Sequence, residues 1–227
     1  NARPGNVTVN ELEANRIDSL KSQGFKQVLE GDAVKADVPA KSQDRVVTNP
    51  PFGSIKDSKG EPTKISVDGY KIGQIDHLIA ARALETMKDD GKATLIIGAN
   101  KVAGGLNTDD RIFFNWLYGN YNVTSHFEVE GDLYQRQGAG WPVRVITING
   151  RVKSDRVSPV AGTIQRAQNW EQVYEHFAAN LDANRAKSEP GAVSRPGGES
   201  TGQAGLQPVR QSAGKPDSTG SDQGQAG

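Results

Sequence analysis

The stretch RVVTNPPF occupies residues 45–52 and decides which fold the chain can adopt. Its first part, Arg45–Asn49, is a short β-branched run of the kind that forms a buried strand. The two prolines that follow fix φ, bias the residue before them away from helix and offer no backbone N–H. We therefore predict a strand that runs into a stiff turn, with the acceptors of Asn49 and Pro50 directed outward.

Strand-like and helix-like patterns alternate around this stretch through the first 150 residues. The strand-like segments are Val7–Glu11, Gln27–Glu30, Ala93–Gly98, Tyr121–Val129 and Val143–Asn149. The helix-like segments are Ala14–Ser22 ending at Gly24, Gln74–Asp90 ending at Gly91, Asp109–Tyr118 with Thr108 as N-cap and Gly119 at its end, and Trp170–Ala186 with Asn169 and Gln172 in capping-box positions. The alternation predicts an α/β fold with a mostly parallel sheet, and the last two strands, with no helix between them, predict an antiparallel pair.

Polar residues stand where several of these strands are expected to end. Open α/β sheets bind ligands beyond the carboxyl ends of their strands. Glu11, Asp32, Asn49 and the loop after Gly98 all fall at predicted carboxyl ends. A ligand site is therefore expected there.

The turn at Asn49 suits the chemistry of an exocyclic amine on a heteroaromatic base. Such a nitrogen is a poor nucleophile, because its lone pair is conjugated into the ring. The Asn49 side-chain oxygen and the Pro50 carbonyl would accept its two hydrogens and direct the lone pair toward a methyl donor. Phe52 would stack on the base, an interaction worth ~1–3 kcal/mol. A base within a duplex would first have to be flipped out.

The composition narrows the possible kinds of site. Lys+Arg and Asp+Glu both number 27, so any nucleic-acid contact must come from a local patch. The absence of cysteine excludes disulfides and thiolate metal sites, and the three histidines share no ligand spacing, so no metal is expected. No apolar run approaches the ~20 residues of a membrane span, and no signal peptide is recognisable. We expect no membrane association and a cytoplasmic location.

The composition also divides the chain into three regions. Residues 1–150 carry the α/β pattern, and residues 151–186 form an extension that contains the last predicted helix. Residues 187–227 are rich in Gly, Ser and Gln and cannot bury enough apolar area to offset the entropy lost on ordering. We predict a disordered linker there.

The Asn-Pro-Pro-Phe string after a strand resembles motif IV of the amino-methyltransferases, which methylate exocyclic or amide nitrogens. The resemblance implies the class I, Rossmann-like methyltransferase fold and S-adenosyl-L-methionine as methyl donor. It implies that Asn49, Pro50, Pro51 and Phe52 form the catalytic turn, with Asn49 also near the donor. For the donor itself it implies Glu11 on the ribose hydroxyls, Asp32 on the adenine amino group, and Leu12 and Ala33 beside the adenine ring. Both acidic residues also suit an ordinary strand end.

Longer strings carry a narrower resemblance, over about Val7 to Arg151. GQIDHLIAARALETMKDDGKATLIIG and YNVTSHFEVEGDLYQRQGAGWPV resemble the methylase region of large phage and plasmid proteins that join an N6-adenine DNA methylase to a helicase. These are the strawberry-notch-like, defence-against-restriction type. The resemblance implies DNA and a downstream helicase domain as partners, in the cytoplasm of a bacterial host. It also implies that Tyr134 is a second aromatic stacking on the base, although a loop anchor is an alternative.

One part of the family pattern is missing. Family members carry a glycine-rich loop after a first strand, and no such segment stands before Val7; KVAGGLNT, residues 101–108, follows the wrong strand. The resemblance therefore implies an N-terminally truncated member. The absent strand would lie between those that end at Glu11 and Asn49, leaving each with an unpaired edge. We expect the isolated chain to be inactive or unstable.

Several alternatives stay open at the level of sequence. The same chemistry could act on a guanine of ribosomal RNA or a glutamine of a protein. A protein of another class, a catalytically inactive DNA-binding platform within a helicase, is also consistent with the missing loop. Trp141 suits packing or insertion into DNA, and Lys101 and Arg136 suit phosphate contacts or solvated loops.

Overall fold

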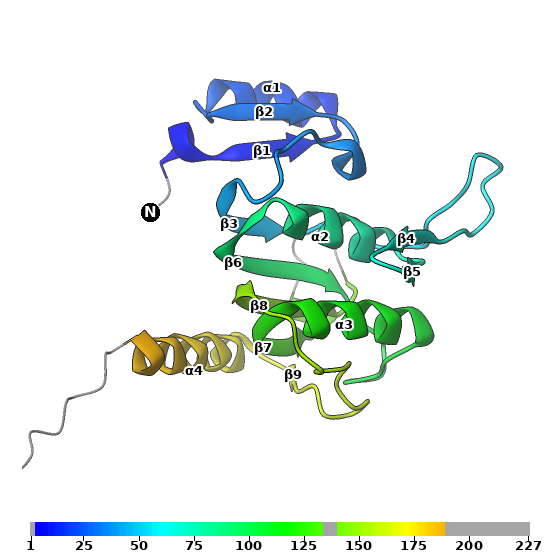
Figure 1. Cartoon of the computed structure of the whole chain (residues 1–227), viewed down its shortest axis with the longest axis vertical. Coiled ribbons are helices and arrows are strands. Elements are labelled where there is room, and N and C mark those ends of the chain that lie inside the picture. The colour runs from blue at the N-terminus through cyan, green and yellow to red at the C-terminus, as the bar shows by residue number, and fades with distance from the viewer. Residues whose placement is uncertain (1–2, 134–139, 189–227) are drawn as a thin grey trace, which may run out of the picture. The chain divides into compact units, whose positions relative to one another are not determined.

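A five-stranded sheet forms the centre of the protein. The computed structural model describes residues 3–133 and 140–188. The strands lie in the order β3 (Gln43–Thr48), β6 (Met87–Gly98), β8 (Val143–Arg151), β7 (Tyr121–Val129) and β9 (Arg166–Ala167) (Figure 1). β8 alone runs opposite to the other four. The mixed, mostly parallel sheet and its antiparallel β7–β8 pair confirm the predicted fold class.

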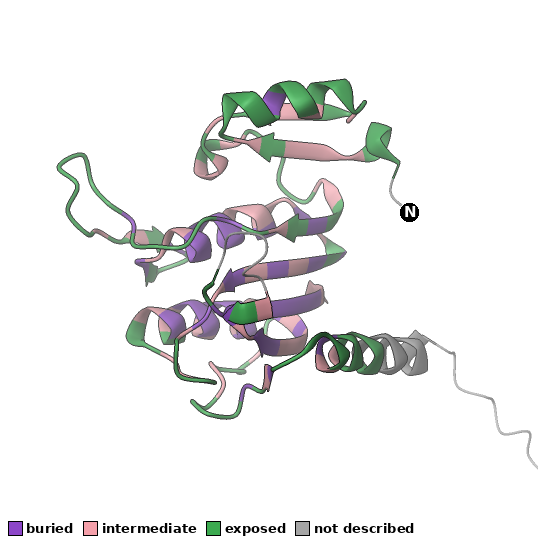
Figure 2. Ribbon diagram, turned by 180° about the vertical axis from the view of Figure 1, so that it is seen from behind, coloured by how far each residue is buried: buried purple, intermediate pink, exposed green. Residues whose placement is uncertain are grey.

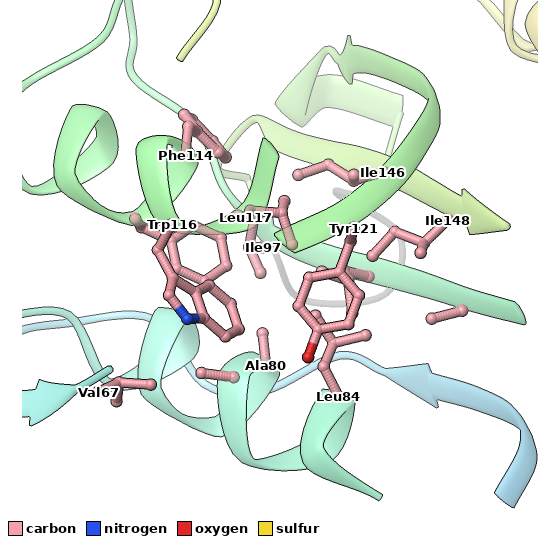
Figure 3. Packing of buried hydrophobic residues seen from close by; sticks show 14 of the residues in the cluster. Val67, Ala80, Leu84, Ile97, Phe114, Trp116, Leu117, Tyr121, Ile146 and Ile148 are labelled. Carbon is pink, nitrogen blue, oxygen red and sulfur yellow. The ribbon is translucent and has the colours of Figure 1, made fainter. Parts of the chain in front are cut away.

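Two helices cover one face of this sheet and a third packs on the other. α2 (Ile75–Glu85) and α3 (Thr108–Asn120) bury their apolar side chains against alternate residues of β6 and β8, including Ile97, Ile146 and Ile148 (Figure 3). The intervening residues Val143 and Val145 point the other way and pack with Val173 of α4 (Trp170–Ser188). β8 is therefore buried on both faces from Val143 to Ile148, whereas β6 alternates buried residues with half-buried or exposed ones (Figure 2).

Two small sheets accompany the central one. β1 (Thr8–Glu11) and β2 (Gln27–Glu30) form a parallel pair joined by α1 (Ala14–Ser22), with the 3₁₀ turns η1 (Pro4–Asn6) and η2 (Ala33–Lys35) on either side in sequence. β4 (Ile65–Val67) and β5 (Tyr70–Ile72) form a short hairpin. Within the described residues β1 pairs only with β2, and β3 only with β6, so each keeps the unpaired edge expected from the sequence. The truncation that would explain these edges stays a prediction.

The predicted helix at residues 74–90 was too long. α2 ends at Glu85, and Met87 already belongs to β6. The last carbonyls of α2 bond to distant groups: Glu85 O accepts from the Lys41 backbone N–H, and both Leu84 O and Glu85 O accept from the Arg151 guanidinium. These partners lie far away in sequence, so local periodicity did not reveal them.

The other helix boundaries needed smaller corrections. Asn107, not Thr108, is the N-cap of α3, because its side chain accepts from Asp110 N while the Asp110 carboxylate accepts from Asn107 N. The helix also continues past Gly119 to Asn120. Asn169 accepts from Gln172 N at the start of α4, as predicted. None of the described helices is both long and apolar enough to cross a membrane.

Candidate functional site

The Asn-Pro-Pro-Phe turn begins where β3 ends, at the carboxyl edge of the central sheet. Thr48, the last residue of β3, is in register with Leu95 of β6. Pro50 is buried and fixes the turn against the protein, whereas Asn49 and Pro51 are exposed. Among the described residues neither the Asn49 amide nor the Pro50 carbonyl has a hydrogen-bond partner. Both acceptors therefore remain free for a ligand.

Phe52 extends this turn into a pocket at the ends of β3 and β6. The pocket has a volume of about 270 Å³, and Phe52, Gly53, Asp76, Asn100 and Trp141 are among the residues that line it. Phe52 is 39% exposed. Its ring packs over Gly98, where an added Cβ would lie 3.4 Å from both the Phe52 ring and the Asp76 carboxylate.

Trp141 forms a second aromatic wall of the same pocket. Its indole N–H donates to Ala99 O at 2.7 Å, which fixes the orientation of the ring, and the side chain is 44% exposed. Lys101 Nζ lies 5.0 Å from the ring centroid. The sequence alone left the role of Trp141 open between packing and insertion into DNA. The feature that could have located Trp141 at this pocket is its position beside Pro142, just before β8.

Two buried ionisable residues at the start of α2 line the inner part of the pocket. Asp76 accepts from Gly98 N at 2.9 Å, and burial raises the pKa of its carboxyl group. His77 stacks on Phe113 with ring centroids 4.3 Å apart, and its buried Nδ1 has no hydrogen-bond partner among the described residues. Burial and the positive charge of Arg144 lower the pKa of His77 to about 3, so its imidazole is neutral at pH 7.

A buried network of charged residues holds the loop that follows β6. Arg144 donates to Gly98 O and Gly105 O, both at 2.7 Å, and pairs with Asp110 at 3.0 Å. Arg166 donates to the carbonyls of Asn100, Lys101 and Val102 and pairs with Glu128 at 2.7 Å. Glu128, fully buried, also accepts from Gly104 N. The network fixes the loop that carries Asn100 into the pocket.

The buried histidines predict a loss of stability in acid. Burial lowers the pKa of both His77 and His126 to about 3, from 6.5. Below pH 6.5 these histidines therefore become protonated in the unfolded chain, whereas in the folded chain they stay neutral down to about pH 3. We expect the free energy of unfolding to fall by up to about 1.4 kcal/mol per histidine for each pH unit in that window. Urea denaturation at pH 7.5, 6.5 and 5.5 measures this, with His126→Gln expected to reduce the slope by about half. A pH-independent stability over this range would contradict it.

The residues proposed for the methyl donor lie at the ends of β1 and β2. Glu11 Oε1 accepts from the backbone N–H groups of Leu12 and Glu13, and these bonds and the nearby Arg16 lower the pKa of its carboxyl group. Asp32 Oδ1 accepts from Val34 N, at the start of η2. Leu12 is 67% exposed. None of these residues lines the pocket at Phe52.

The donor set at these strand ends fits a nucleoside. The two carboxylates follow adjacent parallel strands, where Gly31 N donates to Glu11 O at 2.9 Å. One oxygen of each carboxylate accepts no backbone hydrogen bond, and Glu11 Oε2 lies 3.7 Å from Arg16. Such oxygens can accept hydrogen bonds from hydroxyl and amino groups of a ligand. The exposed Leu12 and half-buried Ala33 add apolar surface beside them.

Other expected features lie elsewhere. Tyr134 and Arg136 fall outside the described residues. A larger hollow of about 600 Å³ lies between β9 and α4, lined by Arg166, Glu175 and His176 among others, and no residue predicted from the sequence contributes to it. In the described ranges no three His, Asp or Glu side chains are grouped as a metal site would require.

Comparisons with known proteins bear on the fold. No family model and no curated protein matches the chain. A solved structure of a putative class I S-adenosylmethionine-dependent methyltransferase from Listeria monocytogenes matches with a TM-score of 0.50 and 13% identity, over 77% of this chain and 53% of that one. A modification subunit of a putative type I restriction enzyme from Vibrio vulnificus YJ016 matches with a TM-score of 0.50 and 12% identity, over 78% of this chain and 41% of that one. The chain thus spans about half, or less, of the proteins it resembles. At this level of identity the likeness concerns architecture, and the chain has the fold of the class I methyltransferases.

Proposed function

We propose that the chain carries the methyl-transfer site of an S-adenosyl-L-methionine-dependent DNA methyltransferase that modifies the N6 amino group of adenine. The observation that carries the proposal is the exposed Asn49 amide, which has no protein partner within the described residues and stands at the carboxyl end of β3. Ligands of open α/β sheets bind at that edge. The motif IV resemblance and the methyltransferase fold both support this assignment.

The turn would orient the amine rather than deprotonate it. Asn49 Oδ1 and Pro50 O would accept the two N6 hydrogens, so the nitrogen lone pair is directed away from the turn. S-adenosyl-L-methionine supplies an electrophilic methyl group on a sulfonium; the new N–C bond forms as the S–C bond breaks, and one N6 proton passes to solvent. Because the leaving group is neutral, the residues contribute mainly position.

The pocket at Phe52 would receive the target base. At about 270 Å³ it lies just below the ~300–1,000 Å³ of pockets for drug-sized ligands, which suits a single base. Phe52 would stack on a flipped base, and Trp141 supplies a further aromatic surface on the same pocket, worth ~1–3 kcal/mol for each ring that stacks. We propose Trp141 in this role alongside Tyr134, which the resemblance implies.

The strand ends of β1 and β2 would hold the methyl donor. Glu11 would accept the ribose hydroxyls and Asp32 the adenine amino group, with Leu12 and Ala33 beside the ring. The donor set described above supports these roles. The glycine-rich loop that the resemblance implies remains part of the proposal.

The proposed setting is a methylase joined to a helicase that protects mobile DNA from restriction in the bacterial cytoplasm. The long strings of residues 73–98 and 121–143 support it. The V. vulnificus structure, described as the modification subunit of a putative restriction enzyme, supports DNA as the substrate.

A labelling experiment tests the proposed function. The protein, in its parent polypeptide, is incubated with tritiated S-adenosyl-L-methionine and unmethylated DNA, ribosomal RNA or bacterial protein. We expect label in DNA. Label confined to RNA or protein would contradict the proposal and indicate that the methylated group is a guanine of RNA or a glutamine of a protein. DNA binding without label in any substrate would indicate the inactive platform.

A further inference from the structure

Three carboxylates are almost fully buried in the described part of the chain, and one of them has no positive partner. Asp110 pairs with Arg144 at 3.0 Å, and Glu128 pairs with Arg166 at 2.7 Å. Asp76 is only 3% exposed, yet no described lysine, arginine or histidine forms an ion pair with it. A buried charge is costly unless it is compensated. The fold thus carries one buried negative charge without compensation.

This uncompensated carboxylate belongs to the wall of the pocket at Phe52. Asp76 lies in the first turn of α2 and is one of the residues that line the pocket. Its Oδ2 accepts from Gly98 N at 2.9 Å. A Cβ added at Gly98 would lie 3.4 Å from this oxygen and 3.4 Å from the Phe52 ring, so the carboxylate and the ring are near neighbours. A base stacked on Phe52 would therefore lie near a negative charge.

Backbone groups hold the Asp76 carboxylate in place without neutralising it. Burial raises the pKa of this carboxyl group, and the negative charge of Asp110 adds to the rise. Backbone N–H groups of Gly98, Asp76 and His77 act in the opposite direction, because their hydrogen bonds stabilise the charged form. The His77 side chain is neutral at pH 7 and supplies no positive charge. A positive charge inside the pocket would offset the cost of burying Asp76.

Methyl transfer would bring a positive charge into this pocket. The N6 lone pair forms the N–C bond, the S–C bond breaks with its electron pair left on sulfur, and the charge of the sulfonium passes to the base. Glu11 and Asp32, proposed to hold the donor, do not line the pocket at Phe52, whereas Asp76 does. The positive charge therefore moves from the donor to the pocket, and it stays there until the base gives an N6 proton to solvent.

We propose that the Asp76 carboxylate stabilises the positive charge that develops on the target base during methyl transfer. The inference rests on the proposed function for the identity of the base. Apart from its amino group, neutral adenine presents ring nitrogens that accept hydrogen bonds, so it gains little from a carboxylate. The methylated cation gains a Coulomb attraction to it. Asp76 would therefore favour the transition state over the bound substrate, which raises kcat more than affinity.

Removing only the charge of Asp76 tests this role. Asp76→Asn keeps the size of the side chain and an oxygen that can accept from Gly98 N. In the parent protein we expect it to lower the single-turnover rate of DNA methylation by about 10–100-fold, with little change in DNA affinity. Asp44→Asn is the matched control, because it makes the same change near the start of β3, where Asp44 pairs with Lys88 at the surface. It should keep the wild-type rate.

The preference of the pocket for a cation is a readout that a purely structural role would not change. The probes are 1-methyladenosine, which is a cation at neutral pH, and neutral adenosine. Isothermal titration calorimetry measures their binding while S-adenosylhomocysteine saturates the donor site. We expect wild type to bind the cation about tenfold more tightly than adenosine, and Asp76→Asn to lose this preference. Asp44→Asn should keep it.

The outcomes separate this inference from the proposed function. A wild-type rate in Asp76→Asn, with DNA methylation by the wild type intact, overturns the role of Asp76 and leaves the proposed function in place. A lower rate with an unchanged preference for the cation also overturns it, because Asp76 would then act only through Gly98. A wild type that methylates no DNA overturns both proposals. If Asp76→Asn unfolds at a lower temperature than wild type, the wild type decides alone, and equal affinity for the two probes overturns the inference.

Discussion

Asn49→Ala is expected to lower the rate of methyl transfer by about 10²–10³-fold, the loss found when one preorganised polar group at a reacting centre is removed. The Asn49 side chain is exposed and bonds to no described residue, so its loss leaves the fold intact. Its oxygen would act on the amine at the reacting centre, so kcat falls while DNA affinity changes little. Single-turnover kinetics with tritiated donor, together with anisotropy on the same duplex, separates the two quantities.

Two further variants define the origin of that loss. Asn49→Asp keeps an acceptor oxygen at the same position and should retain more activity than Asn49→Ala. Asn122→Ala removes an amide that donates to Asn149 O between β7 and β8, away from the pocket, and should keep wild-type activity. A wild-type rate in Asn49→Ala, or a fall matched by Asn122→Ala, would contradict the role given to the turn.

The second large effect is expected on stability, from the charges buried beneath the loop after β6. Glu128→Gln removes the negative charge that lies 2.7 Å from Arg166 and 3.4 Å from Arg144 Nε. Breaking a buried ion pair from one side leaves an uncompensated charge, which destabilises a fold by about 3–5 kcal/mol. Urea denaturation of Glu128→Gln measures this change. Lys88→Gln is the control, because its pair with Asp44 lies at the surface, and it should unfold close to wild type.

A double-variant cycle shows whether the effect belongs to the pair. Removing Arg166 as well takes away the charge that Glu128 compensates, so Glu128→Gln/Arg166→Gln should lose less stability than the sum of the single variants. Strict additivity would mean that the two side chains act independently, contrary to the contacts described.

The sequence revealed the secondary elements whose signals are local. The β-branched run before Asn49 predicted β3, and Gly24, which has positive φ, marked the end of α1. The proline pair is a further local signal, because it stops a strand wherever it occurs, and it placed Asn49 at a strand end. The α2 boundary failed for the opposite reason, since Arg151, far along the chain, binds the last carbonyls of the helix.

The parts of the site that the sequence missed depend on long-range packing. Glu128 and Arg144 fall within predicted strands and Arg166 within no predicted element, yet the three side chains contact one another and the loop after β6. β9 was not expected because it is only two residues long and pairs with β7 across an irregular segment. Such long-range contacts produce no periodic pattern in the sequence from which they could be predicted.

The identity of the methylated nucleoside decides whether the protein transfers methyl groups to the N6 amino group of adenine. Unmethylated genomic DNA is incubated with the parent protein and S-adenosyl-L-methionine, digested to nucleosides and analysed by mass spectrometry against the Asn49→Ala protein as background. We expect wild type to produce N6-methyl-2′-deoxyadenosine and the Asn49→Ala protein to produce it at near background level. N4-methylcytosine as the product, or equal N6-methyl-2′-deoxyadenosine from both proteins, would contradict it.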